Sequence, residues 1–331
     1  MMKKRLGIIL LLFINLYGYS QDPQFSQFYA APLYLGPSLA GTAGNSRVCL
    51  NYRDQWPKLS GKFLTYSLSY DTYLSQYNSG VGLLLLRDDA GSGKLTTTQA
   101  GLNYSYRVKA GKDFFIQPGI QFMYYQRKID FEKLTFADQY YNDQVLPQSI
   151  ESPPGNQNGH IDFTTSLMAF NKNFWFGSTL DHMMRMNTSL QEDTRYVPLK
   201  LSVYGGVKTV INEAFMNVDE QSVSVAFNYR TQAMLQQLDL GVYYNRHPFT
   251  VGLWYRGIPV IKSTKTKDAI SILGGLNIKD VAVSYSYDLT VSKLVSSTGG
   301  AHEISIIYYF DQYFNGKSKH RITGAVPCPR F

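Results

Sequence analysis

The side chains that most often carry out chemistry are few and scattered in this sequence. No two of the five histidines have the spacing that would place both on one side of a helix as metal ligands. His302 and Glu303 are neighbours, so in a strand they would point to opposite faces and could not form an acid–base pair. No serine has the G-x-S-x-G setting of a hydrolase nucleophile. We therefore predict no enzymatic activity and no bound metal or cofactor. The histidines are His160, His182, His247, His302 and His320.

A pair of aspartates and a pair of cysteines could also take part in chemistry, but each has a simple structural explanation. Asp88 and Asp89 precede Ala-Gly-Ser-Gly, but the remaining ligand positions of a calcium loop are missing, which favours a turn. Cys49 and Cys328 lie near opposite ends of the chain. Neither has a second cysteine at metal-ligand spacing, and the spacing leaves open whether they form a disulfide or stay free.

The first twenty residues have the pattern of a cleaved secretory signal. Lys3, Lys4 and Arg5 precede the apolar stretch 6–16, and Gly18 and Ser20 are small residues before a cut at Gln21. The apolar stretch is too short to span a membrane as a helix. We expect residues 1–20 to be a signal peptide whose removal lowers the net charge from +8 to +5. The basic residues do not cluster, so we expect no nucleic-acid partner.

The composition indicates a membrane β-barrel. Aromatic residues make up 15% of the chain and charged residues only 17%, against roughly 25% charged residues in a typical soluble domain. After the signal no apolar run is long enough for a spanning helix, and a transmembrane barrel distributes its apolar residues one in two along its strands.

From about residue 43 the apolar residues alternate with polar ones. In 222–230, for example, Val223, Val225, Phe227 and Tyr229 oppose small and polar residues. Three features favour tilted transmembrane strands over a soluble sandwich. The segments are about ten residues long, aromatic residues lie near their ends, and the polar face carries small and ionisable residues that suit a water-filled lumen. We predict an all-β fold, an outer-membrane antiparallel barrel of about 14 strands. The predicted strands are 44–55, 62–73, 78–87, 95–109, 113–128, 160–170, 173–182, 199–210, 221–231, 234–244, 249–257, 268–277, 280–290 and 301–310.

The segments around the predicted barrel are irregular. Residues 21–42 contain three prolines and enough apolar residues for a helical turn or two. Lipid cannot satisfy irregular backbone, so we place 21–42 in the lumen or at its periplasmic mouth, and assign the barrel to 43–310. Long loops are expected at 131–158, at 183–198 and in parts of 258–267 and 291–300. Residues 311–331 should form a basic periplasmic tail.

Two motifs resemble the PorP/SprF family of type IX secretion membrane proteins. One is DPQFSQFYAAPLYLGPSLAGT, directly after the signal, and the other is NYRDQWP at the end of the first predicted strand, residues 51–57. In layout the resemblance covers nearly the whole mature chain. It implies a non-enzymatic outer-membrane component of the secretion and gliding machinery, which helps to export large proteins such as adhesins or to attach them to the surface. The implied partners are cargo with a C-terminal sorting domain, periplasmic or outer-membrane components of the machinery, and outer-membrane lipid.

The two motifs supply the candidate site residues. Arg53 offers a fork of hydrogen-bond donors, and Trp56 is a flat amphipathic side chain at a membrane surface. The motif residues either attach the N-terminal segment to the barrel wall or bind a partner directly. A passive channel or solute transporter of the same fold is the alternative function. The residues are Asp22, Gln24, Phe25, Ser26, Gln27, Tyr29, Arg53, Gln55 and Trp56.

Overall fold

The computed structural model describes residues 22–310 apart from 62, 92–94, 132–133, 142–143, 148, 151–156, 188, 190–195, 213–219, 259–268 and 292–297. Fourteen strands close into one antiparallel barrel, so the predicted fold and strand number are confirmed. Their bounds are β1 (Ser46–Gln55), β2 (Phe63–Leu74), β3 (Ser79–Ala90), β4 (Leu95–Tyr106), β6 (Phe115–Lys128), β9 (Gln157–Phe170), β10 (Phe174–Asp181), β11 (Lys200–Asn212), β12 (Gln221–Gln232), β13 (Leu235–Arg246), β14 (Phe249–Ile258), β15 (Ala269–Ile278), β16 (Val281–Thr290) and β17 (Ala301–Phe310).

The barrel closes by pairing its first strand with its last. The β1–β17 register begins at Ser46 opposite Phe310 and ends at Gln55 opposite Ala301. Every other strand of the barrel pairs with its neighbours in sequence, and the short strand β5 (Val108–Lys109) pairs with β6 below the end of β4. Closure satisfies the backbone donors and acceptors that an open sheet would expose to lipid.

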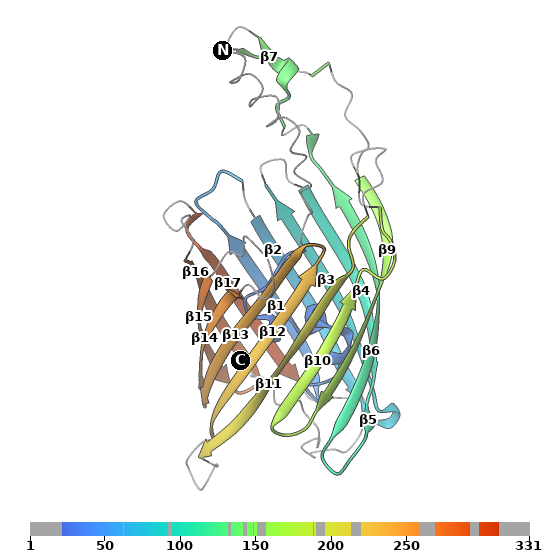
Figure 1. Ribbon diagram of the computed structural model, residues 1–331, viewed down its shortest axis with the longest axis vertical. Coiled ribbons are helices and arrows are strands. Elements are labelled where there is room, and N and C mark those ends of the chain that lie inside the picture. The colour runs from blue at the N-terminus through green and yellow to red at the C-terminus, as the bar shows by residue number, and fades with distance from the viewer. Residues whose placement is uncertain are drawn as a thin grey trace, which may run out of the picture.

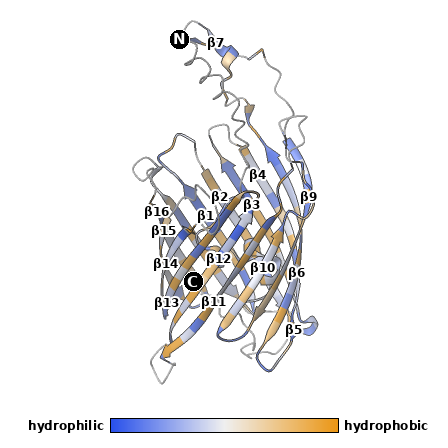
Figure 2. Cartoon of the chain, in the orientation of Figure 1, coloured by the Kyte–Doolittle hydropathy of each residue, from blue (hydrophilic) through white to orange (hydrophobic). Residues whose placement is uncertain are grey.

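The alternation predicted from the sequence is present in the wall. On β12 the side chains of Ser224 and Asn228 face inward and are buried, whereas Val225 faces outward and is exposed. Hydrophobic and hydrophilic residues alternate along the strands in Figure 2. His302 and Glu303 face opposite sides as expected, because Glu303 is buried in the lumen and His302 contacts the exposed Tyr285.

The connections differ between the two ends of the barrel. One end carries the start of β1, the end of β17 and short links such as 171–173, 247–248 and 279–280. The other carries the long connections, including 129–156 with its hairpin β7 (Tyr140–Tyr141) and β8 (Gln144–Val145), which rises above the wall in Figure 1. Short turns are typical of the periplasmic end of such barrels and longer loops of the extracellular end, so the long connections lie at the extracellular end.

The N-terminal segment lies inside the barrel lumen. We call residues 22–44 the plug. It contains η1 (Phe28–Ala30), α2 (Pro32–Leu35) and η2 (Pro37–Leu39), and most of its residues are buried. Two further short helices in the part of the chain that the structure describes are η3 (Ser75–Tyr77) and η5 (Ala137–Gln139). Among the described residues, no helix is both long and apolar enough to cross a membrane.

Two expected parts of the chain lie outside the described residues. They are the signal peptide 1–20 and the tail 311–331, which includes Cys328. Cys49 has no disulfide partner among the described residues and is buried on the inner face of β1, among residues that pack on the plug.

Candidate functional site

The start of the plug is bound to the wall through its own backbone. The amides of Ser26 and Gln27 donate to the two carboxylate oxygens of Glu303 at 2.7 and 2.9 Å. The Gln27 side chain also donates to Ser286 (3.1 Å) and accepts from Ser284 (2.5 Å). A carboxylate that accepts two backbone amides fixes both position and direction of this segment.

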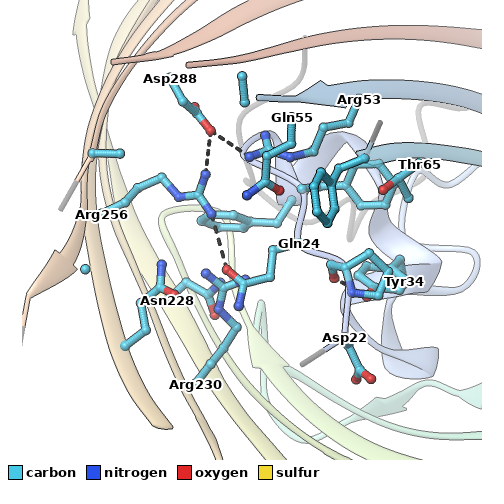
Figure 3. A pocket seen from close by; sticks show the side chains of 18 of the residues that line it. Asp22, Gln24, Tyr34, Arg53, Gln55, Thr65, Asn228, Arg230, Arg256 and Asp288 are labelled. Carbon is cyan, nitrogen blue, oxygen red and sulfur yellow. Dashed lines mark hydrogen bonds and ion pairs between the residues drawn. The ribbon is translucent and has the colours of Figure 1, made fainter. Parts of the chain in front are cut away.

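Arg53, from the second motif, lies in the same cluster. Its guanidinium contacts Asp288 at 2.8 Å and Glu303 at 3.1 Å, and it donates to the Ser26 hydroxyl. Arg256 donates to that hydroxyl at 2.7 Å and to Asp288 at 2.8 Å. Figure 3 shows both arginines directed toward Asp288. The two sequence motifs are therefore joined in the structure through one buried cluster of charged side chains.

Asp22 attaches the very start of the plug at the extracellular end. Its carboxylate contacts Nε2 of His182 at 2.8 Å and Nζ of Lys200 at 3.1 Å, while Nδ1 of His182 contacts Asp162 at 2.8 Å. Burial disfavours the charge on Asp22, but Lys200 and His182 outweigh burial and hold its pKa well below the usual range. Burial also opposes the charge on His182, yet Asp22 and Asp162 raise its pKa to about 10.

The middle of the plug packs on aromatic residues of the wall. Phe28 lies 4.7 Å, ring to ring, from Trp254, and Tyr29 lies 5.8 Å from Trp175. Nε1 of Trp175 donates to the Tyr29 hydroxyl at 3.1 Å. Phe25 packs edge-on against Tyr34, whose hydroxyl donates to the Pro23 carbonyl. The lumen here is a packed core and not the wet polar interior that the alternation suggested.

A cavity of about 560 Å³ lies between the plug and the strand ends at the extracellular end. Gln24 is at its floor and accepts from Arg256 at 3.4 Å. Gln55 and Trp56 line the cavity where β1 ends, and the Trp56 ring lies 5.3 Å from that of Phe63. Of the nine residues proposed from the sequence, seven therefore meet the plug–wall contact, and Gln55 and Trp56 lie at the cavity above it.

The sequence analysis missed the wall residues that receive the plug, line the cavity or support those residues. For most of them the signal was present, because a charged side chain or a large ring interrupts the small polar face of the strand. Within 249–257, Trp254 and Arg256 occupy the face shared by Thr250 and Gly252. The missed residues are Asp162, Trp175, His182, Lys200, Asn228, Arg230, Asp239, Trp254, Arg256, Asp288 and Glu303.

The arrangement can hold a chain segment and present a polar cavity. Both nitrogens of His182 are occupied by carboxylates, so the imidazole cannot take a proton from a substrate in this state. Among the described residues, no cluster of three or more histidines, cysteines or carboxylates could hold a metal ion.

Comparison with solved structures places the fold among outer-membrane barrels. The toluene transporter TbuX of Ralstonia pickettii is similar, with a TM-score of 0.52, 9% identity and coverage of 85% of this chain and 94% of that one. The toluene transporter TodX of P. putida has a TM-score of 0.47 and 10% identity over 85% of this chain and 93% of that one. At 9% identity the likeness to TbuX concerns the fold alone.

The sequence itself decides the family. No curated protein matches the chain. Residues 17–308 match the family described as "Type IX secretion system membrane protein PorP/SprF", which spans the plug and nearly all of the barrel. The chain belongs to the PorP/SprF family of type IX secretion system membrane proteins.

Proposed function

We propose that this barrel serves type IX secretion by binding protein partners, and that it helps to export large cargo such as adhesins or to attach them to the cell surface. The single observation that supports binding over conduction is the plug. It occupies the lumen from Asp22, beside the extracellular cavity, to Gly41, beside the opposite barrel end.

The plug is attached too firmly to be a loose stopper. Ser26 and Gln27 share Glu303 with Arg53. Removing one partner of a buried ion pair of this kind strongly destabilises the folded protein. At the other end, the amide of Gly41 donates to Asp71 at 2.8 Å, and Asp71 also pairs with Arg47 at 2.8 Å. A passive channel would need an open path, which favours the binding role over the alternative of a solute transporter.

The partners that fit this role are secreted proteins with a C-terminal sorting domain and other components of the secretion machinery. The long connections and the cavity offer surfaces to cargo at the extracellular end, and the short links offer surfaces to periplasmic components. The role requires no catalysis, cofactor or nucleic acid. Gliding motility would follow where the cargo is a motility adhesin.

Crosslinked pull-down from native outer membranes tests the proposal. We expect recovery of large secreted proteins and of secretion components, together with loss of cargo from the surface when the gene is deleted. Purified protein in planar bilayers should show no steady ion conductance. Recovery of neither class of partner, with unchanged secretion in the deletion strain, would overturn the proposal, and steady conductance would favour the channel.

A further inference from the structure

The extracellular cavity has the size and enclosure of a binding site. Its volume of about 560 Å³ falls within the range of roughly 300–1,000 Å³ that is typical of ligand pockets. Plug residues Gln24 and Phe25 are among the residues that line it. The ends of strands on opposite sides of the barrel form its wall, as the positions of Arg53 and Asn228 in Figure 3 show. The question is which chemistry this cavity would recognise.

The charges around the cavity are already compensated by the wall. Arg53 and Arg256 share Asp288, each at 2.8 Å, and Arg230 contacts Asp239 at 2.6 Å. Because these guanidinium groups have carboxylate partners, the cavity is not built to attract a strongly anionic ligand. Among the described residues, the Nε atoms of Arg53, Arg230 and Arg256 are buried without a hydrogen-bond partner, so their compensated charge still leaves single donors unused.

Uncharged amide side chains supply further hydrogen-bonding capacity, both as donors and as acceptors. Asn228 lines the cavity and is completely buried, and neither its amide nitrogen nor its amide oxygen has a partner among the described residues. Oε1 of Gln236 is also buried without a partner. Buried polar groups are nearly always hydrogen-bonded, so an amide with both atoms free points to a ligand. The amide side chains that line the cavity are Gln24, Gln55, Asn228, Gln232, Gln236 and Gln237.

An extended polypeptide presents the matching groups. Each peptide unit carries one donor and one acceptor, which is the pair that an asparagine side chain can satisfy at once. Aromatic surfaces lie beside the amides, with Phe25 at the floor and Trp56 and Phe63 at the wall. Amides for the backbone and apolar surfaces for side chains are the two elements that recognise an extended peptide.

We propose that this cavity binds an uncharged, extended segment of polypeptide from the secreted partner, with Asn228 hydrogen-bonded to its backbone. The proposal rests on the proposed function, because that role brings a polypeptide to the extracellular end. It adds the place of binding and the chemistry of the bound segment.

A photo-crosslinking residue at position 235 tests the site. Leu235 lines the cavity at the start of β13, while Leu240 on the same strand faces outward and is 44% exposed, which makes it a matched control. p-Benzoylphenylalanine at each position would be irradiated in native outer membranes of secreting cells. We expect a polypeptide adduct at position 235 and not at position 240.

The variant Asn228→Ala tests the role of the amide. It removes both unpartnered atoms without adding volume, and we expect it to lower the yield of the adduct about tenfold, the effect of losing one to two hydrogen bonds. Heat-modifiable mobility on gels would check that the barrel assembles, and Asn228→Ser provides a second variant should the first assemble poorly.

The remaining outcomes each overturn the proposal in a distinct way. A saccharide adduct at position 235 would replace the polypeptide with a glycan. An unchanged yield in Asn228→Ala would remove Asn228 from the site. An adduct no stronger at position 235 than at position 240 would overturn the site itself, and if the pull-down still recovered secretion partners, the proposed function would stand without it.

Discussion

The two halves of the plug are attached to the same wall by different forces. The outer half, residues 22–30, ends in ion pairs and charged hydrogen bonds, through Asp22 on His182 and Lys200 and through Ser26 on Glu303. The inner half, residues 36–42, is attached by close approach of its backbone to the wall, with charged contacts confined to its periplasmic end, where Gly41 is bound by Asp71 and Arg107. Neutralising a charge near Ser26 should therefore loosen the outer half, whereas added volume in the wall should dislodge the inner half.

Glycines in the wall make the close approach of the inner half possible. A Cβ at Gly80 would lie 2.1 Å from the carbonyl oxygen of Ala40, and one at Gly119 would lie 2.3 Å from the amide nitrogen of Ser38. The Ala40 carbonyl also accepts from the side chains of Gln117 (2.8 Å) and Ser105 (2.9 Å). The wall lacks side chains where the plug backbone must pass and supplies donors beside it.

The largest effect should come from Glu303→Ala, which acts on the outer half. It leaves the amides of Ser26 and Gln27 without their acceptor and removes one of the two carboxylates on Arg53. Breaking a buried pair in this way costs about 3–5 kcal/mol. Hydrogen exchange should become much faster in residues 22–30 than in 36–42, and bilayer conductance should rise.

Glu303→Gln is the matched control for that experiment. Its amide oxygen can still accept one backbone hydrogen bond, so the loss of protection should be smaller than in Glu303→Ala. Equal acceleration of exchange in both halves would show that the plug is released as one unit and would remove the distinction between them.

A somewhat smaller effect, on the inner half, should follow from Gly119→Val. The added side chain would overlap the backbone of η2, and overpacking of this kind typically costs about 1–3 kcal/mol. Gly274→Val is the control, because a Cβ there meets no atom within 4 Å. We expect faster hydrogen exchange in residues 36–42 for the first variant and no change for the second. Unaltered protection in Gly119→Val would mean that the glycines do not determine the fit.

The sequence was sufficient to predict the barrel because period-two alternation follows directly from strand geometry. The predicted strand 301–310 has the bounds of β17, and strand 249–257 falls one residue short of β14. Predicted strand 78–87 stops before Asp88, whereas β3 continues to Ala90, because Thr65 and Thr96 on the adjoining strands accommodate Asp88 and Asp89 through hydrogen bonds of 2.7 and 2.6 Å. Such pairings across strands are invisible in a local pattern.

Of the contact between plug and wall, the sequence predicted the plug residues and Arg53 but not the other wall residues. The plug motif and Arg53 were found because they lie in continuous stretches of sequence. Glu303 and Asp288 come from the last two strands, and only barrel closure brings them to Ser26, across 277 and 262 positions of the chain. Their presence on a small polar face was a usable signal, but their partner was not specified by any spacing.

A change of pH should alter the hydrogen-exchange protection of the outer half more than that of the inner half, without any substitution. The pKa of His182 is raised from 6.5 to about 10, so its contribution to stability is complete below pH 6.5 and disappears as the pH rises through about 10. The pKa of Asp22 is lowered, so its contribution is complete above its usual value of 3.8 and declines only as the pH falls below that value. Protection of residues 22–30 should be greatest between these limits.

His182→Gln is the control for the pH experiment. It should remove most of the decline in protection between pH 6.5 and 10, after correction for the intrinsic rate of exchange. His182 is one of several links of the outer half, so the effect should be smaller than that of Glu303→Ala. A decline of equal slope in the variant would assign the pH dependence to another group.

The smallest effect on the plug should come from Trp56→Ala, which lies beyond both halves. Trp56 lines the cavity, and its ring packs edge-on against Phe63, a contact worth about 0.5–1.5 kcal/mol. Its backbone φ is 59°, a conformation that alanine would adopt at a similar cost, so the substitution tests the ring. We expect normal assembly and unchanged protection of residues 22–30 and 36–42, but weaker recovery of cargo in the crosslinked pull-down. Reduced heat stability with normal secretion would instead show that Trp56 helps to attach the plug. Trp56 would then belong to the structural interior and not to the binding end of the barrel.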